Sequence, residues 1–300
     1  MAKLYLGIDA GGTATRWRLI DSSGSTCARG EAAALSGHIF NDAAREKALS
    51  VIASLAAGLP AGIELQAIAA GITGLDHSSP AAGFFRDALA DSFKLNSARV
   101  KIVSDTWLSY LACFRPGEGI VISAGTGSIA VHLTEKLELF RAGGHGALID
   151  DLGSAVWIAL EAVRRISALE DRAPGSGWET ALGRRIAFGI GGSSWDHARA
   201  LIYSGDRGRI GLLARHVAAA AEGGGVDAQR ILRAAGSHLA DLAETLRGRL
   251  GTLPVVFTGR AFNLHPSIAA ALMEKLPGAE RAASAISGAE AAARLARDSI

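Results

Sequence analysis

The sequence predicts a mixed α/β protein of two lobes, and three observations predict it. An apolar strand that enters a glycine turn occurs twice, at residues 7–13 and at residues 120–127, so the two halves are expected to share a topology. Strand and helix patterns alternate up to residue 115, whereas residues 154–250 have helical periodicity and almost no strand signal. A chain of 300 residues is also long enough for two domains.

The first lobe is expected to begin with a β-hairpin. Residues 4–9 form an apolar strand, a glycine turn follows, and an alternating return strand runs through residues 17–21. After a third strand, Asn41 or Asp42 can cap a helix. The expected apolar face of that helix consists of Ala48, Leu49, Ile52 and Leu55. The remaining elements are a buried strand over 65–70, a helix from Ser79-Pro80 to about Phe93, a strand over 99–103 and a helix over 106–114.

The second lobe is expected to start after a linker. Residues 115–119, Arg-Pro-Gly-Glu-Gly, are polar and rich in helix breakers. A strand over 120–124 and an alternating strand that ends near Leu133 then repeat the opening hairpin. The helical stretch 154–250 breaks at 174–175, 189–192, 205 and 223–225, and a strand over 254–258 and a helix over 287–298 complete the chain. These patterns predict an N-terminal lobe over 1–115 and a C-terminal lobe over 116–286.

The composition narrows the class of protein. Lys and Arg number 31 against 29 Asp and Glu, a net charge of +2, so the dense basic surface of a nucleic-acid-binding protein is not expected. Asp9 ends the first apolar run too early for a signal peptide or a membrane span, which favours a cytoplasmic protein without a membrane partner. Cys27 and Cys113 lack the spacing of a metal or iron-sulfur ligand set and are expected to be reduced thiols.

Glycine is over-represented, with 37 residues where average usage gives about 21. The clusters at 11–12 and 125–127 each follow a strand, where backbone N–H groups without a neighbouring Cβ can face an anion. Threonine hydroxyls, such as those of Thr13 and Thr15, can add donors. The predicted phosphate-binding residues are Gly11, Gly12, Thr13, Gly125, Thr126 and Gly127. A tight structural hairpin is the alternative for the first cluster.

Two other nucleotide motifs do not fit the sequence. The spacing Gly125-x-Gly127-x-x-Ala130 is followed by a strand pattern, whereas a dinucleotide-binding turn opens a helix. No glycine-rich run with the Lys-Ser/Thr ending of a P-loop occurs.

Two aspartates lie where predicted strands end. Asp9 would repel a bare phosphate, so we expect it to hold Mg²⁺ through water, with the nucleotide phosphates as further ligands. Asp105 lies between a buried strand and a helix, from which its carboxylate can orient an acceptor hydroxyl and take its proton during phosphoryl transfer. Asp105 is therefore the predicted catalytic base, and a helix N-cap is the alternative role.

Several segments resemble the superfamily of actin, heat-shock ATPases and sugar kinases. LGIDAGGTATRWRLID resembles its first phosphate motif, VISAGTGSIA its second and VVFTGRAF its adenosine motif. Residues 143–163, GGHGALIDDLGSAVWIALEAV, are similar to a segment of N-acetylglucosamine kinases in the BadF/BadG/BcrA/BcrD ATPase family. The resemblance implies two actin-like (ribonuclease H-like) lobes around a nucleotide and substrate cleft. The second lobe is enlarged by helices, and the C-terminal helix 287–300 joins the first.

The same resemblance implies further site residues. VSDTWLSYL resembles the catalytic aspartate segment, which supports Asp105 as the base. The implied adenosine-binding residues are Thr258, Gly259 and Arg260, and the implied sugar-binding residues are Ser36, Asp105, Thr126, Gly144 and Asp151. A structural role for the pair Asp150-Asp151 at the start of a helix is the alternative. Asp150 replaces a more usual glycine, Leu152 an acid and His145 an aromatic residue, so the sugar is left open.

The predicted function is phosphorylation of an amino sugar, N-acetylglucosamine or glucosamine at its 6-hydroxyl, with ATP and Mg²⁺. The alternatives are a kinase for a different sugar and an activator-type ATPase of the same family that holds an iron-sulfur cluster between subunits. A non-enzymatic sensor is a third class, and the oligomeric state, with a homodimer among the alternatives, is open.

Overall fold

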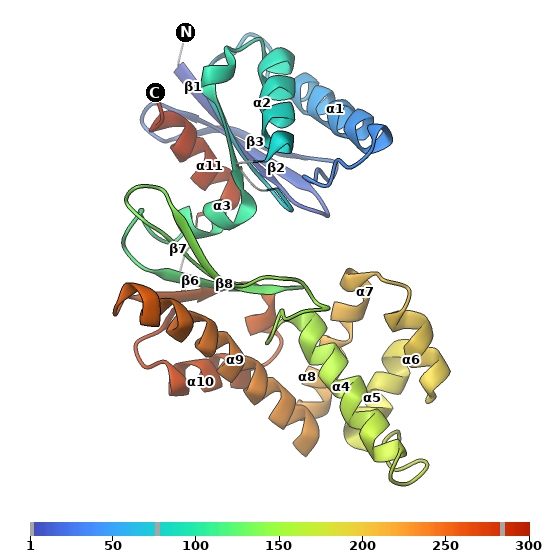
Figure 1. The fold of residues 1–300 in the computed structure, drawn as a ribbon. Helices are drawn as coiled ribbons and strands as arrows, with labels where there is room; N and C mark the ends of the chain where they lie inside the picture. Colours follow the sequence, from blue (N-terminus) through green and yellow to red (C-terminus); the bar gives the residue numbers. More distant parts are fainter. Residues whose placement is uncertain (1–2, 76–78, 283–285) are drawn as a thin grey trace. The chain divides into compact units, whose positions relative to one another are not determined.

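The computed structural model describes residues 3–75, 79–282 and 286–300 (Figure 1). The chain divides into two compact units, the first made of Met1–Arg115 and Ser284–Ile300 and the second of Pro116–Ala283. The lobe boundary expected at 286/287 adjoins residues 283–285, which lie outside the described residues. The C-terminal segment therefore returns to the first unit.

The first unit contains a five-stranded sheet in the order β3-β2-β1-β4-β5. Strands β1, β2 and β3 pair antiparallel as two hairpins, and β4 and β5 extend the sheet in parallel with β1. The strands are β1 (Lys3–Ala10), β2 (Thr15–Asp21), β3 (Thr26–Ala32), β4 (Glu64–Ile72) and β5 (Val100–Ser104). The helices are α1 (Asp42–Ala57), α2 (Pro80–Phe93), the 3-10 helix η1 (Ser97–Arg99), α3 (Asp105–Leu111) and α11 (Gly288–Arg297).

Alternation along β1 separates the two faces of this sheet, because successive side chains of a strand point to opposite sides. Leu6 and Ile8 join the apolar core beneath α1 and α2, which includes Ile52 and Phe85. Gly7 lies on the other face, directly beneath α11. The N-terminal hairpin is thus covered on one side by helices close in sequence and on the other by the C-terminal helix.

The second unit repeats this topology, with the sheet order β10-β9-β6-β7-β8. Strand β6 takes the place of β1: it pairs antiparallel with β7 and parallel with β9, and β8 and β10 form the two edges. The expectation that the two halves share a topology is confirmed. The strands are β6 (Ile120–Ala124), β7 (Ser128–Leu133), β8 (Leu139–Gly143), β9 (Val255–Thr258) and β10 (Glu280–Arg281).

Helices enlarge the second unit, as expected from residues 154–250. The long helix α9 packs against β6, β7 and β8, and α10 packs along α9 (Figure 1). The helices are α4 (Ala155–Glu170), α5 (Ala181–Ile190), α6 (Trp195–Ile202), α7 (Arg207–Leu212), α8 (Ala214–Glu222), α9 (Val226–Leu250), the 3-10 helix η2 (Arg260–Asn263) and α10 (Pro266–Lys275). None of the helices within the described residues is both long and apolar enough to span a bilayer.

Three sequence expectations differ from the structure. Leu49 is 44% exposed, and Val51 lies in the buried face of α1 instead, because the i, i+3, i+4, i+7 spacing of that face runs through residues 48, 51, 52 and 55. Helix α3 ends at Leu111, and not at 114, because the chain tightens into a turn there, in which the Cys113 N–H donates to the Tyr110 carbonyl three residues back at 2.9 Å. The short strands β8 and β10 were not expected.

Candidate functional site

The parallel strands of the first unit bring two aspartates to one edge of the sheet. Asp9 pairs with Gly71 of β4, and Gly71 pairs with Val103 of β5, so β1, β4 and β5 end in neighbouring positions. Asp105 follows β5 directly as the first residue of α3. In open α/β sheets, ligands bind beyond the carboxyl ends of such strands.

The environment of Asp105 argues against a purely structural role. The N-cap of α3 is Ser104, and the Asp105 carboxylate makes no hydrogen bond to another described residue. The alternative role of Asp105 as a helix cap is therefore wrong. Its half-buried carboxylate is free to bind a ligand.

Asp9 lies beside Asp105 in an environment that disfavours its charge. Burial raises the pKa of the Asp9 carboxyl, the negative charge of Asp105 raises it further, and Arg16 partly offsets both. On its other side the carboxylate touches α11, where a Cβ on Gly288 would lie 2.5 Å from Asp9 Oδ2. Two interacting carboxylates at a partly buried edge are the hard oxygen ligands that suit a magnesium ion.

The turn between β1 and β2 is tight and open to one side. The Gly11 N–H donates to the Ala14 carbonyl at 3.1 Å, and a Cβ on Gly12 would meet no atom within 4 Å. Gly11 and Gly12 do not have positive φ angles, so backbone strain does not require glycine at either position. A Cβ on Gly11 would lie 3.2 Å from the Ala14 carbonyl oxygen, so of these two glycines Gly12 is the one that borders free space. The expectation that the Thr15 hydroxyl donates to a bound anion is wrong, because this hydroxyl is buried and donates to the Ala33 carbonyl at 2.7 Å.

The corresponding turn of the second unit is held by helix α4. The Gly125 N–H donates to the Gly127 carbonyl at 2.8 Å, and the Ala155 N–H of α4 donates to the Gly125 carbonyl at 2.9 Å. A Cβ on Gly125 would meet no atom within 4 Å, whereas one on Gly127 would lie 2.9 Å from the Asp151 carboxylate oxygens. Gly127 therefore makes room for Asp151, and Gly125 borders open space.

Asp151 lies four residues before α4 and does not begin that helix, whose N-cap is Ser154. Its carboxyl is buried, its φ is +51°, and its Oδ1 accepts the Ser128 N–H at 3.2 Å. Positive φ is uncommon outside glycine and occurs more often for Asp and Asn. The strained backbone is held so that the carboxylate reaches the turn at residues 125–127.

Asp150 and His145 close the loop that precedes α4. Asp150 Oδ1 accepts the backbone N–H groups of His145, at 2.9 Å, and of Asp151, and Asp150 Oδ2 lies 2.6 Å from His145 Nδ1. Gly144, with a φ of +74°, lies against Ile129, where a Cβ would be 2.7 Å from Cδ1. The loop is fixed by its own polar groups.

The adjacent acids Asp150 and Asp151 have pKa values shifted in opposite directions. Burial raises the pKa of Asp151, and the Asp150 charge adds to this, against the hydrogen bond from Ser128 and the positive charge of Arg207. Desolvation also acts on Asp150, but the hydrogen bonds from the His145 ring and from two backbone N–H groups outweigh it and lower its pKa.

Substituting each acid with asparagine should therefore change stability in opposite directions. Asp151→Asn raises the thermal midpoint at neutral pH, because folding there requires burial of a charge; this gain fades as the pH falls toward 3.8, where the unfolded carboxyl is also neutral. Asp150→Asn lowers the midpoint at neutral pH, and this loss fades as the pH falls through the lowered folded-state pKa. Thermal unfolding of the two variants, followed from neutral to acidic pH, measures both shifts of the midpoint. Shifts of the same sign at neutral pH would contradict the opposite pKa shifts of Asp150 and Asp151.

The third segment of the second unit is the turn after β9. Gly259 has a φ of +111°, and a Cβ there would lie 2.1 Å from the Ala124 carbonyl oxygen at the end of β6. Only glycine fits this position. Thr258 is half-buried opposite Ser123, and Arg260 is exposed at the start of η2.

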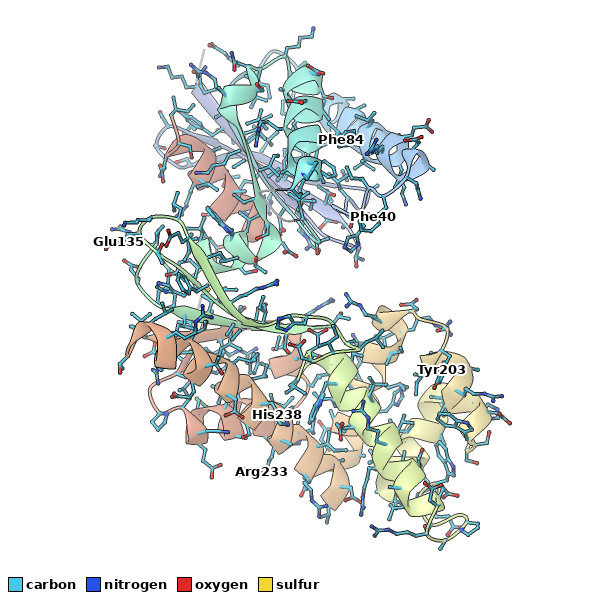
Figure 2. All side chains as sticks on the ribbon, viewed as in Figure 1. Phe40, Phe84, Glu135, Tyr203, Arg233 and His238 are labelled. Atoms are coloured by element: carbon cyan, nitrogen blue, oxygen red, sulfur yellow. The ribbon has the colours of Figure 1, made fainter. Side chains whose placement is uncertain are left out.

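The loop after β3 carries Ser36. The Ser36 hydroxyl accepts the His38 N–H at 3.2 Å, and the Gly37 N–H donates to the Thr73 carbonyl at 2.9 Å, which fixes this loop to the end of β4. Phe40, labelled in Figure 2, is 88% exposed and stacks on the His38 ring at 5.6 Å. The loop therefore lies at the same sheet edge as the two aspartates.

In each unit, then, the predicted residues gather where parallel strands end. The first unit holds Asp9, the turn at 11–13, Ser36 and Asp105, and the second holds the turn at 125–127, Asp151 and residues 258–260. Sequence reasoning missed Gly288 and Ser128. The only sequence signal for Gly288 is its place after the Ser287 N-cap, and Ser128 contributes a backbone N–H that no side-chain pattern shows.

Two sheets of the same five-stranded topology, each with a glycine turn after its first strand, define the two-lobed actin-like ATPase fold. Residues 6–296 match the BadF/BadG/BcrA/BcrD ATPase family, and the chain belongs to this family. The predicted fold class and family are both confirmed.

Solved structures agree with this assignment. The structure of a putative N-acetylglucosamine kinase from Chromobacterium violaceum matches with a TM-score of 0.76 and 26% identity, over 98% of this chain and 99% of that one. A putative N-acetylglucosamine kinase from Porphyromonas gingivalis matches with a TM-score of 0.70 and 17% identity over the same shares. A ROK family glucokinase from Streptomyces griseus, in complex with glucose and AMPPNP, shares the fold with a TM-score of 0.58, 18% identity and the same coverage.

Proposed function

We propose that this protein is an ATP-dependent sugar kinase whose acceptor is an amino sugar, N-acetylglucosamine or glucosamine, phosphorylated at the 6-hydroxyl. The observation that carries the proposal is the pair Asp9 and Asp105, brought together at the ends of parallel strands with interacting charges. One carboxylate for a metal ion and one for an acceptor hydroxyl are the acidic groups that phosphoryl transfer to a sugar requires. The amino-sugar acceptor is supported by the similarity to the Chromobacterium violaceum protein.

In this proposal Asp105 orients the sugar hydroxyl and accepts its proton as the new oxygen–phosphorus bond forms. The unpartnered carboxylate supports this role, because a hydrogen-bonded cap would be less available to a substrate. Asp9 would hold the magnesium ion through water, and magnesium with ATP would supply an activated γ-phosphoryl group. Among the described residues no group of three or more His, Cys, Asp or Glu could hold a metal, which fits an ion bound mainly by nucleotide phosphates.

The glycine turns supply the remaining contacts. Backbone N–H groups at Gly11, Gly12 and Thr13, and at Gly125, Thr126 and Gly127, would bind the nucleotide phosphates in the open space beside Gly12 and Gly125. Residues 258–260 would bind adenosine. Asp151, with Ser36, Thr126 and Gly144, would bind sugar hydroxyls. Catalysis then rests on positioning and charge stabilisation.

The test is ADP release with ATP and Mg²⁺ over a panel of acceptors. N-acetylglucosamine or glucosamine should stimulate turnover more than N-acetylmannosamine, glucose or a keto-deoxy sugar acid. If only another sugar stimulates turnover, the proposed kinase activity stands and the proposed acceptor is wrong. If no sugar stimulates turnover, the proposed kinase activity is wrong.

The cysteines give little support to the activator-type alternative. Cys27 is exposed on β3 and Cys113 follows α3, and burial raises the pKa of the Cys113 thiol, which disfavours the thiolate that an iron-sulfur cluster needs. The visible absorbance of anaerobically purified protein tests this alternative, and we expect no absorbance from an iron-sulfur cluster.

A further inference from the structure

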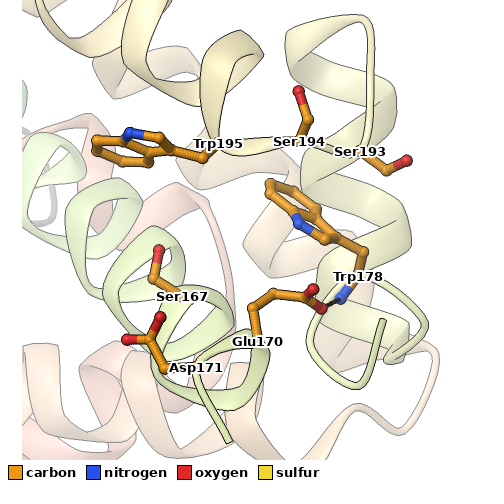
Figure 3. A pocket seen from close by; sticks show the side chains of 7 residues that line it. All are labelled: Ser167, Glu170, Asp171, Trp178, Ser193, Ser194 and Trp195. Carbon is orange, nitrogen blue, oxygen red and sulfur yellow. Dashed lines mark hydrogen bonds between the residues drawn. The ribbon is translucent and has the colours of Figure 1, made fainter. Parts of the chain in front are cut away.

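The second unit contains a pocket of about 550 Å³ that the proposed kinase reaction does not use (Figure 3). It lies at the C-terminal end of α4, between the loop 171–180 and the first turn of α6, whereas Asp151 precedes the N-terminal end of α4. The lining residues are Ser167, Glu170, Asp171, Trp178, Ser193, Ser194 and Trp195.

Two tryptophans form the apolar walls of this pocket. Trp195 is 49% exposed and Trp178 is half-buried, so indole surface remains open to a ligand. In Figure 3 the two rings border the pocket from two sides, and Ser167 and Asp171 lie across from Trp195. Aromatic walls with a few polar groups are the usual lining of a site for a small molecule.

The Trp178 wall is held in place by a partly buried hydrogen-bond network around Glu170. One Glu170 oxygen accepts the N–H groups of Gly177 and Trp178, at 2.7 and 3.0 Å, and the other accepts that of Gly175, at 2.8 Å. These bonds lower the pKa of Glu170, so it stays charged. The loop that carries Trp178 is thereby preorganised, which reduces the entropy cost of binding.

The Trp195 wall depends on the glycine cluster at 189–192, which the kinase proposal leaves without a role. Gly191 ends α5 with a φ of +80°, and a Cβ on Gly192 would lie 2.5 Å from the His197 ring. The chain therefore turns tightly there and packs on α6. This turn brings Ser193 and Trp195 to the pocket.

The polar groups restrict the charge of the ligand. Within the described part of the chain the Asp171 carboxylate and the Ser193 and Ser167 hydroxyls make no side-chain hydrogen bond, so they are available to a ligand. Glu170 and Asp171 are acidic, and the lining set includes no Lys, Arg or His. A phosphorylated ligand would meet two carboxylates without a cation, which is unfavourable.

We propose that this pocket binds the ring of a saccharide that is neutral or carries an amine, as a second site separate from the proposed kinase site. The apolar C–H face of the sugar packs on the Trp195 indole, and its hydroxyls or ammonium group donate to Asp171. The hydroxyls of Ser167 and Ser193 can donate or accept. Nucleotides and sugar phosphates are excluded by charge.

The test uses the five tryptophans as reporters, since each gives one indole N–H signal in a nitrogen-15 NMR spectrum. Trp→Phe variants assign the signals of Trp178 and Trp195. Titration of the full chain with glucosamine and N-acetylglucosamine should shift both signals, and the 6-phosphates of the same sugars and ATP should not. Binding at the proposed kinase site is measured separately, from the indole signal of Trp107 in α3. A failure of the pocket proposal can therefore be distinguished from a failure of the kinase proposal.

Two variants and one control complete the experiment. Trp195→Ala should weaken the affinity reported by the Trp178 signal by about two- to tenfold, the size of one aromatic contact. Asp171→Asn should weaken the binding of glucosamine more than that of N-acetylglucosamine. Tyr203→Ala removes an exposed aromatic ring at the end of α6, outside the lining set (Figure 2), and should change nothing. Pocket signals that stay fixed up to the solubility limit of both sugars, or that move equally with the phosphates, overturn the proposal.

Discussion

Replacement of Asp105 by asparagine is expected to lower kcat by about 10²–10⁴, the range for loss of a general base, which corresponds to about 3–5 kcal/mol of transition-state stabilisation. Asparagine has nearly the same shape but cannot take the proton of the acceptor hydroxyl. Ser104 caps α3, so the substitution leaves the helix start intact. Removal of one of two interacting carboxylates should leave ATP binding at wild-type strength or improve it.

The control is Asp87→Asn, which removes an exposed acid from α2 of the same unit and should leave kcat unchanged. ADP release gives the rate of each variant, and titration with a nucleotide analogue gives its ATP affinity. Wild-type turnover in Asp105→Asn would remove this residue from the role of base. Lost turnover together with lost ATP affinity would instead assign it to the nucleotide site.

The order of the elements could be predicted because it depends on local patterns. Strands β1, β6 and β9 are continuous apolar runs next to glycine, and α2 begins at the Ser79-Pro80 pair that the sequence marks. The repeat of one sheet topology followed from the similarity between the segments around Asp9 and Ser123. By contrast, β10 has only two residues, both exposed, and its existence depends on pairing with β9. No periodicity could reveal it.

The candidate site likewise has some features that the sequence could predict and others that depend on tertiary structure. Glycines after strands were predicted to lie near ligands, and Gly12 and Gly125 do border open space. Gly127 and Gly259 have a different role, since each makes room for a neighbour, the Asp151 carboxylate and the Ala124 carbonyl. Such contacts join residues far apart in sequence, and a chain without its fold does not show them. The φ of +51° at Asp151 is equally a product of tertiary structure.

The close approach of the C-terminal helix α11 to strand β1 helps to position Asp9 in the candidate site. Its buried face is made of alanines, which lets α11 lie directly on β1, and the Arg18–Glu290 ion pair ties its first turn to β2. Because Gly288 at the start of the same helix touches the Asp9 carboxylate, the distance between α11 and β1 also sets the position of Asp9.

Gly7→Ala should therefore destabilise the first unit strongly. An added Cβ would lie 2.1 Å from the Ala289 carbonyl oxygen and 2.2 Å from the Ala293 nitrogen, and these are backbone atoms that move only with the helix. Overpacking of a core costs about 1–3 kcal/mol, and a clash with backbone falls at the upper end. A loss of about 3 kcal/mol lowers the thermal midpoint by about 6–12 °C for a unit of this size.

Gly83→Ala is the matched control, since Gly83 lies within α2 of the same unit and its Cβ would meet no atom within 4 Å. Alanine in a helix interior is better than glycine by about 0.5–1 kcal/mol, so this variant should be slightly more stable than the wild type. Thermal unfolding measures both variants. If Gly7→Ala unfolds at the wild-type temperature, α11 cannot lie on β1 as closely as the structure places it, and the contact between Gly288 and Asp9 is lost with it.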